Sequence, residues 1–138
     1  MNWKESLADL GGGDLTFLSG DGAMIEFVVV DEPIIFNTTY QKQEQQKVGW
    51  PVMTADGFTL LIVGKRVARK MIGLEKYAKT KAFSLIRHGI EGDTNATYKL
   101  TVLENAEPAN TLFAMAKKDY NKQLLVDAVA AAKDCMDK

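Results

Sequence analysis

A cation and a phenol stand at the two ends of the segment 87–98, which reads Arg-His-Gly-Ile-Glu-Gly-Asp-Thr-Asn-Ala-Thr-Tyr. The guanidinium of Arg87 is suited to a phosphate group, and the ring of Tyr98 is suited to stacking on a base. Glycine, Asp93 and Asn95 between them are turn-forming residues. The segment therefore has the residue types of a hairpin that binds nucleic acid.

The runs on either side of the turn have the composition of β-strands. Residues 82–86 and 98–103 are rich in apolar and β-branched side chains, and the turn formers lie between them. We therefore predict two strands joined by a glycine-bearing turn, whatever the function of the hairpin.

Charge is distributed unevenly along the chain, although the formal net charge at pH 7 is only -1. Residues 1–41 contain one cation and seven acids, residues 42–99 contain eleven cations and five acids, and residues 100–138 contain five cations and six acids. A basic excess in the middle of the chain is what a phosphate backbone attracts. A solvated surface of uneven charge explains the same counts, and charge alone favours that interpretation.

The other reactive residues do not form a catalytic or metal-binding set. His88 is the only histidine and Cys135 the only cysteine, so neither an intramolecular disulfide nor a Cys/His zinc site can form. Asp93 and Thr94 beside His88 lack a nucleophile and an orienting group, and the glycines 11–13 precede a strand where a phosphate loop would open a helix. We therefore expect a protein that is not an enzyme and needs no cofactor.

Length and composition predict one compact domain. The chain has 138 residues, 46% hydrophobic and 25% charged. It has no apolar run near the roughly 18 residues of a membrane span, and its start lacks the layout of a signal peptide. Together with the single cysteine, these features favour a cytoplasmic location.

Periodicity predicts strands before and after one inserted helix. Asn2 and Glu5 resemble a capping box for a short helix that the glycines 11–13 would end. A Gly-Asp-Gly turn joins the first two predicted strands as a hairpin, and Asp56-Gly57 forms a later turn. The predicted strands are residues 14–19, 24–30, 34–41, 58–63, 82–86 and 98–103.

Three segments are not expected to be strands. The polar segment 41–47 has neither helical nor strand periodicity, so we predict an exposed and mobile loop. Residues 65–78 place apolar side chains at helical spacing beside a basic flank. From residue 111 onward the composition is helical, with an interruption near Asn121.

The order of these elements predicts a mainly β fold with helices, namely a five-stranded OB-fold Greek-key barrel with a helix inserted between strands. Residues 1–13 would form the N-terminal helix and glycine-rich turn, residues 14–103 the barrel, and residues 109–138 a C-terminal helical segment. No internal repeat or linker indicates a second domain.

Over residues 15–102 the chain resembles the small single-stranded DNA-binding proteins of tailed bacteriophages, which are OB-folds. Three features carry the resemblance: Asp-Glu-Pro at 31–33, Gly-Trp-Pro-Val at 49–52 with Asp-Gly behind it, and the Arg-x-Gly, Asp-Thr and Thr-Tyr pattern within 87–98. The resemblance implies a non-catalytic protein that coats and protects strands exposed in phage DNA replication or recombination, in the host cytoplasm.

The resemblance also implies how a strand is held, with bases stacked on aromatic rings and Lys and Arg following the phosphates of a groove. Phe58 is expected in the core, and the cations at the start of the inserted helix are expected to lie away from the groove. The predicted DNA-binding residues are Tyr40, Lys42, Lys47, Trp50, Arg87, Tyr98 and Lys99.

Several alternatives stay open at this point. Duplex DNA or RNA is expected as a weaker ligand, replication or recombination proteins as further partners, and a homodimer as one state of the chain. The chain ends Ala-Lys-Asp-Cys-Met-Asp-Lys, without the acidic tail by which many such proteins recruit enzymes. The alternative function is a protein-interaction or assembly module whose contact surface is the C-terminal helix around Leu125 and Val129, unless that stripe packs on its own barrel or forms a dimer.

Overall fold

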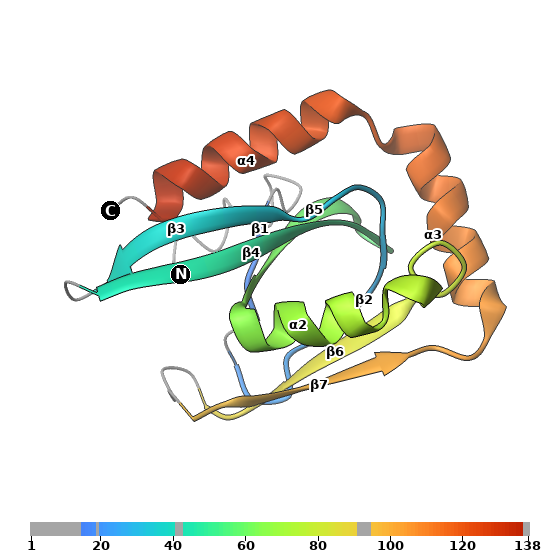
Figure 1. The fold of residues 1–138 in the computed structure, drawn as a ribbon. Helices are drawn as coiled ribbons and strands as arrows, with labels where there is room; N and C mark the ends of the chain where they lie inside the picture. The colour runs from blue at the N-terminus through green and yellow to red at the C-terminus, as the bar shows by residue number, and fades with distance from the viewer. Residues whose placement is uncertain (1–14, 19, 41–42, 91–94, 137–138) are drawn as a thin grey trace, which may run out of the picture.

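The computed structural model describes residues 15–18, 20–40, 43–90 and 95–136 (Figure 1). These residues form a mixed α/β fold that is mainly β, and the helix predicted near residue 2 lies outside them. No described helix is long and apolar enough to cross a membrane. The elements are β1 (Leu15–Thr16), β2 (Met24–Val29), β3 (Ile34–Tyr40), β4 (Gln43–Thr54), β5 (Gly57–Gly64), α2 (Lys65–Gly73), the 3-10 helix η1 (Glu75–Tyr77), β6 (Phe83–His88), β7 (Thr97–Val102), α3 (Ala106–Asp119) and α4 (Lys122–Met136).

The seven described strands form one open sheet. Its order is β1-β5-β4-β2-β6-β7, and β3 pairs with the first half of β4. The sheet curls so that β6 and β7 lie across from β4 and β5, with α2 between them (Figure 1). In the described part of the chain no ladder joins β5 to β7, so the predicted closed five-stranded barrel is not confirmed.

The core lies on both faces of β5. Leu60 and Ile62 pack on the outer face, beneath α3 and α4, whereas Leu61 and Val63 pack on the inner face, against α2. A strand that is buried on both faces has a continuous run of apolar residues in its sequence. The sequence therefore predicted this strand. Phe58, 9% exposed, belongs to the outer cluster, so its predicted place in the core is confirmed.

The first strand pairs differently from the prediction. The predicted hairpin between residues 14–19 and 24–30 is wrong, because β1 pairs in parallel with β5, with Leu15 opposite Leu60. β2 instead pairs with β6 through residues 24–27 and with β4 through residues 28–29. The Gly-Asp-Gly turn nevertheless exists: Gly22 has a φ of 78°, which suits glycine, and it reverses the chain into β2.

The polar segment predicted as a loop is instead the start of the longest strand. Residues 43–49 of β4 pair one by one with residues 34–40 of β3, and we call this pair the β3–β4 ribbon. A backbone ladder needs no apolar side chains where a ribbon extends beyond the core. A bond from Gln46 Nε2 to Asn37 Oδ1, at 3.1 Å, joins the two strands further. The prediction of a mobile loop is therefore wrong for residues 43–47.

The bend between β2 and β3 explains how Pro51 can lie inside β4, a central strand of the sheet. β4 pairs with β2 through Val52 and with β3 from Gly49 backward, so Pro51 lies where the ladder changes partner. The bend, residues 30–33, interrupts the ladder there, and the carbonyl of Pro51 accepts a hydrogen bond from the backbone of Val30 at 2.9 Å. A missing N–H group is tolerated at such a position.

The helices lie close to where the sequence predicts them. α2 buries Val67 and Met71, and the C-terminal helical segment is divided at Tyr120, beside the interruption predicted at Asn121. α3 begins a few residues earlier than predicted, because a proline is tolerated in the first turn of a helix. Its N-terminus is capped by Asn105, whose Oδ1 accepts a hydrogen bond from a backbone N–H of the first turn.

Asp31 joins the β2–β3 bend to the junction of α3 and α4. Its Oδ2 accepts hydrogen bonds from the Tyr120 hydroxyl at 2.6 Å and from Lys122 Nζ at 2.9 Å. The bond from Tyr120, followed by that from Lys122, lowers the pKa of Asp31 from 3.8 to about 2. Burial, and then the carboxylate, raise the pKa of Tyr120. The bend and α4 are thus fixed relative to each other.

Candidate nucleic-acid interface

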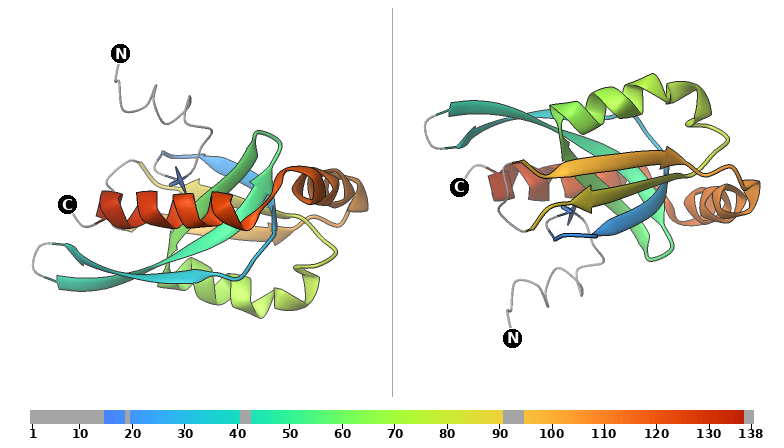
Figure 2. Two further views of the ribbon diagram at one scale, coloured as in Figure 1. Left: turned by 90° about the horizontal axis from the view of Figure 1, so that it is seen from above. Right: turned by 90° about the horizontal axis from the view of Figure 1, so that it is seen from below.

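Three structural features lie together at one end of the molecule, on the left in Figure 1. They are the free end of the β3–β4 ribbon, the start of α2 and the turn end of the hairpin formed by β6 and β7. Both views in Figure 2 show the same arrangement, with the ribbon extending beyond the other elements. Most of the predicted site residues belong to these features.

Arg87 and Tyr98 face each other across the β6–β7 hairpin. Arg87 Nη1 donates to the Tyr98 hydroxyl at 2.9 Å, and the guanidinium carbon lies 5.7 Å from the ring centre. Nη2 donates to the carbonyl of Ile90 at 2.8 Å and Nε to that of Gly89 at 3.3 Å. Arg87 is only 7% exposed. Its guanidinium therefore holds the hairpin, and it is not presented to solvent as a free phosphate ligand.

Trp50 does not lie on the surface as its predicted stacking role requires. Its side chain is 7% exposed and packs in the inner cluster with Val52 and Leu61. Alternation along β4 explains this, because the even-numbered residues from Val48 onward point to the inner face. The buried Nε1 of Trp50 has no hydrogen-bond partner among the described residues.

The other predicted contacts do not share one face. Lys47 lies opposite Phe36, an outer-cluster residue, so it is on the outer face of the ribbon, and it is half-buried. Lys99 is exposed on the side of β7 that points away from the inner cluster, whereas Tyr98 is half-buried within that cluster. Tyr40 ends β3, but its side chain, like the whole of Lys42, lies outside the described residues.

α2 supplies cations that the sequence interpretation set aside. The helix buries Val67, Ala68 and Met71 and exposes its other long side chains. Its first turn contains no acid. The exposed cations of the helix are Lys65, Arg66, Arg69 and Lys70.

α2 and the β6–β7 hairpin are in direct contact. Lys70 Nζ donates a hydrogen bond of 3.0 Å to the carbonyl of Tyr98, so the helix cations lie beside the hairpin. The amphipathic spacing within 65–71 was the sequence signal for this exposed cationic face. The sequence did not indicate which elements lie next to this face, because that depends on how the sheet curls around α2.

Two exposed aliphatic side chains belong to the ribbon and to the hairpin. Ile35, on the ribbon, is 64% exposed, and Ile90, after β6, is 72% exposed. Ile35 alternates with two outer-cluster neighbours, so its side chain is on the inner side of the ribbon, which faces α2. These residues provide exposed apolar surface on the ribbon and the hairpin, the two features on either side of α2.

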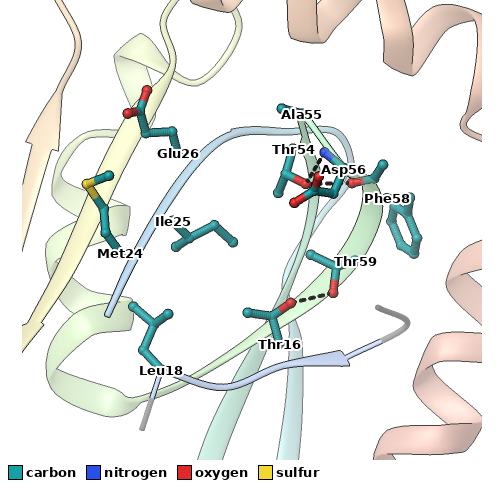
Figure 3. Close-up of a pocket in the computed structure, with 11 residues that line it drawn as sticks. Thr16, Leu18, Met24, Ile25, Glu26, Thr54, Ala55, Asp56, Phe58 and Thr59 are labelled. Atoms are coloured by element: carbon teal, nitrogen blue, oxygen red, sulfur yellow. Dashed lines mark hydrogen bonds between the residues drawn. The ribbon is translucent and has the colours of Figure 1, made fainter. Parts of the chain in front are cut away.

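A separate pocket of about 490 Å³ lies between β1, β2 and the β4–β5 turn (Figure 3). The hydroxyls of Thr16 and Thr59 are hydrogen-bonded to each other across one side of it at 2.8 Å. Its charged lining residues are Glu26 and Asp56, both exposed carboxylates. A pocket of this charge does not suit a polyanion. In the described part of the chain, no three His, Cys, Asp or Glu residues are grouped so as to hold a metal ion.

The apolar stripe of α4, which the alternative function would use, packs on the molecule's own sheet. Leu125 is 6% exposed within the outer cluster, and Val129 packs against that cluster. Figure 1 shows α4 lying over β3 and β5. This surface is therefore used inside the protein.

No protein-family model, curated protein or solved structure matches the chain at a significant level.

Proposed function

We propose that the protein binds single-stranded DNA without sequence specificity and protects strands exposed during phage replication or recombination. The observation that carries the proposal is the exposed face of α2, where four cations and no acid lie between the β3–β4 ribbon and the β6–β7 hairpin. A groove of cations beside apolar surface holds a phosphate backbone and its bases at the same time.

The connectivity supports an OB-type arrangement that is open between β5 and β7. β2, together with its continuation β3, corresponds to the first strand, β4 and β5 to the next two, and β6 and β7 to the last two, with the helix in between. In OB-folds the loops after the first and fourth strands border the binding site. In this chain the described ends of the β3–β4 ribbon and of the β6–β7 hairpin, which adjoin those loops, lie on either side of α2.

The structure changes which residues we assign to contacts with the DNA strand. Phosphates would pair with the exposed cations of α2, and bases would pack on Ile35, Ile90 and the accessible part of Tyr98. Lys99 remains a candidate at the edge of the hairpin, whereas Arg87 acts by fixing the hairpin's shape.

The test is a titration of a fluorescently labelled oligothymidylate, followed by anisotropy at salt concentrations from about 50 mM to about 200 mM. We expect binding at low salt and a log-log slope of about -0.7 for each phosphate neutralised on a single strand. Duplex DNA and RNA of equal length serve as competitors and should displace the oligomer less well. Absence of binding at low salt, or affinity that does not change with salt, would rule out the proposal.

A further inference from the structure

We propose that the pocket of Figure 3 and a hollow beside it form one groove, the β2 groove, which binds an extended, basic segment of a partner protein. The segment would add as a strand to the unpaired edge of β2. This inference does not depend on the proposed function, because the β2 groove and α2 have no residue in common.

The start of β2 has a neighbouring strand on one side only. Residues 24–27 pair with β6, whereas the ladder with β4 contains Val28 and Val29. β4 turns back into β5 after Thr54, so no ladder of described residues covers residues 24–27 on that side. An uncovered strand edge presents free N–H and C=O groups, which are a template for another strand.

Hydrogen bonds at the two ends of β2 show which of its backbone groups are free. The carbonyl of Ala23 accepts a bond of 2.9 Å from a backbone N–H of β6, and the N–H of Val30 donates one of 2.9 Å to a carbonyl of β4. In an antiparallel ladder, the backbone groups of successive residues point alternately to the two edges of the strand. Those of Met24 and Glu26 therefore point to the uncovered side, where the pocket lies.

The β2 groove joins two hollows that share Glu26 and Ala55. The pocket of about 490 Å³ has β2 on one side and the β4–β5 turn on the other (Figure 3). The second hollow, of about 300 Å³, extends to the start of α3, where Pro108 and Leu112 line it. Ligand sites in proteins have volumes of about 300–1,000 Å³, so the groove has room for the side chains of an added strand.

The charged side chains of the β2 groove are all carboxylates. Glu26 and Asp56 line the pocket, Glu107 lines the second hollow, and all three are exposed. Neither lining contains a Lys, Arg or His residue, and none of the three acids forms an ion pair with a described residue. No three described acids are grouped so as to hold a metal ion. Acids spaced in this way suit separate cationic side chains along a segment.

Alternation along β2 specifies the residue types of the segment. Ile25 and Leu18 pack against the inner cluster, whereas Met24 and Glu26 are exposed on the opposite face of β2. A strand beside β2 would place its alternate side chains next to these two sets. We therefore expect apolar residues next to Ile25, alternating with Lys or Arg next to Glu26.

Two other occupants match the charge of the groove less well. A second copy that added its own β2 edge would bring two acidic edges together, and like charges at an interface disfavour association. The chain's own residues 1–14 contain one Lys and three acids. A basic partner is therefore the occupant that charge favours.

The probe is a short synthetic peptide in which lysine and valine alternate, labelled with fluorescein and titrated with the full chain while anisotropy is recorded. Two N-methylated forms are titrated beside it, one methylated on every lysine and the other on every valine. Alternate N–H groups of an added strand face β2, so one form should lose binding and the other should retain it. The inactive form is the lysine-methylated one for an antiparallel strand and the valine-methylated one for a parallel strand. A peptide with glutamate in place of lysine should not bind.

Charge variants of the protein test the groove itself. Glu26→Lys replaces an attraction with a repulsion and should weaken binding of the peptide by about tenfold. Asp119→Lys, at the exposed end of α3 and outside both linings, changes the net charge equally and should leave binding unchanged. Urea unfolding of both variants verifies that the fold is intact.

Four results would overturn the proposal. Equal binding of both N-methylated forms excludes strand addition, and equal losses in Glu26→Lys and Asp119→Lys indicate a general attraction to net charge. Dimerisation that the peptide reverses, measured by analytical ultracentrifugation, assigns the groove to a second copy. Absence of binding to the full chain is the result expected if residues 1–14 fill the groove. Each of these results leaves the proposed function standing, since none involves α2.

Discussion

The Arg87 guanidinium donates a 2.9 Å hydrogen bond to the Tyr98 hydroxyl from the opposite strand of the hairpin, and the two residues lie in direct register. Two backbone carbonyls of the following turn accept the remaining hydrogen bonds of the guanidinium. A sequence pattern that suggested two separate ligand contacts is therefore one internal contact that shapes the hairpin.

Tyr98→Phe should destabilise the fold and leave DNA affinity unchanged. The substitution keeps the ring but leaves one nitrogen of the buried Arg87 without its acceptor, which should cost about 1–3 kcal/mol of unfolding free energy. Urea unfolding measures this change, and Lys99→Met, on the exposed side of β7, is the control expected to stay within about 0.5 kcal/mol. A large loss of affinity with no loss of stability would mean that the tyrosine hydroxyl contacts DNA.

Gly49→Ala should destabilise the junction of the ribbon with the sheet. A Cβ atom at this position would lie 2.9 Å from Phe36 Cε2 and 3.0 Å from Leu60 Cγ, closer than packed side chains tolerate. We expect a loss of about 1–3 kcal/mol, measured by chemical denaturation. Gly73→Ala, where a Cβ meets nothing within 4 Å at the end of α2, should instead be neutral or stabilising by up to about 1 kcal/mol.

Stability should depend on the protonation of Asp31. Its pKa is lowered in the folded protein, so its contribution is complete above the ordinary pKa of 3.8 and is lost as the pH falls through about 2. Asp31→Asn should lower stability near neutral pH by about 1–3 kcal/mol and flatten the pH dependence between about pH 4 and about pH 2.

Thermal unfolding at several pH values tests the Asp31 prediction. Glu32→Gln, a neighbouring exposed carboxylate, is the control and should behave as the unmodified chain does. An unaltered acid transition in Asp31→Asn would show that the bonds to Tyr120 and Lys122 do not stabilise the fold.

The salt dependence of DNA binding should report on individual cations of α2. Arg66→Met and Arg69→Met should each weaken binding to all sequences alike and reduce the log-log slope by about 0.7, because each removes one phosphate contact on a single strand. Lys117→Met and Lys118→Met, on the exposed end of α3 and remote from α2 in Figure 1, should change neither quantity. Equal effects of both pairs would indicate a nonspecific response to net charge.

Local sequence patterns predicted most helices and strands, but they did not predict which strands pair when these lie far apart in the sequence. The continuous apolar run of β5, the Asp56-Gly57 turn and the stripe of α2 each carry a signal within a few neighbouring residues. The start of β4 carries none, because its ladder uses backbone groups and its side chains are polar. The parallel partner of β1 was equally unpredictable, since β1 is two residues long and Leu15 lies far from Leu60 in the sequence.

The candidate site shows the same division. The sequence indicated cations and aromatic residues in the right segments, but not which side chains the sheet would bury. Trp50 points inward because of its register in β4, and Arg87 is enclosed by its own hairpin. The exposed face of α2 became a candidate binding surface only in the folded structure, where the curled sheet places the helix beside β7.

The parallel pairing of β1 with β5 has a consequence for the order of folding. The β4–β5 hairpin closes over a two-residue turn. The pairing of Leu15 with Leu60 instead closes a long loop of the chain that contains β2, β3 and β4. Contacts that close long loops form late in folding, because the chain loses conformational entropy before these contacts stabilise it. We therefore expect β1 to dock last and open first, so that its backbone amides exchange hydrogen with solvent faster than those of β5.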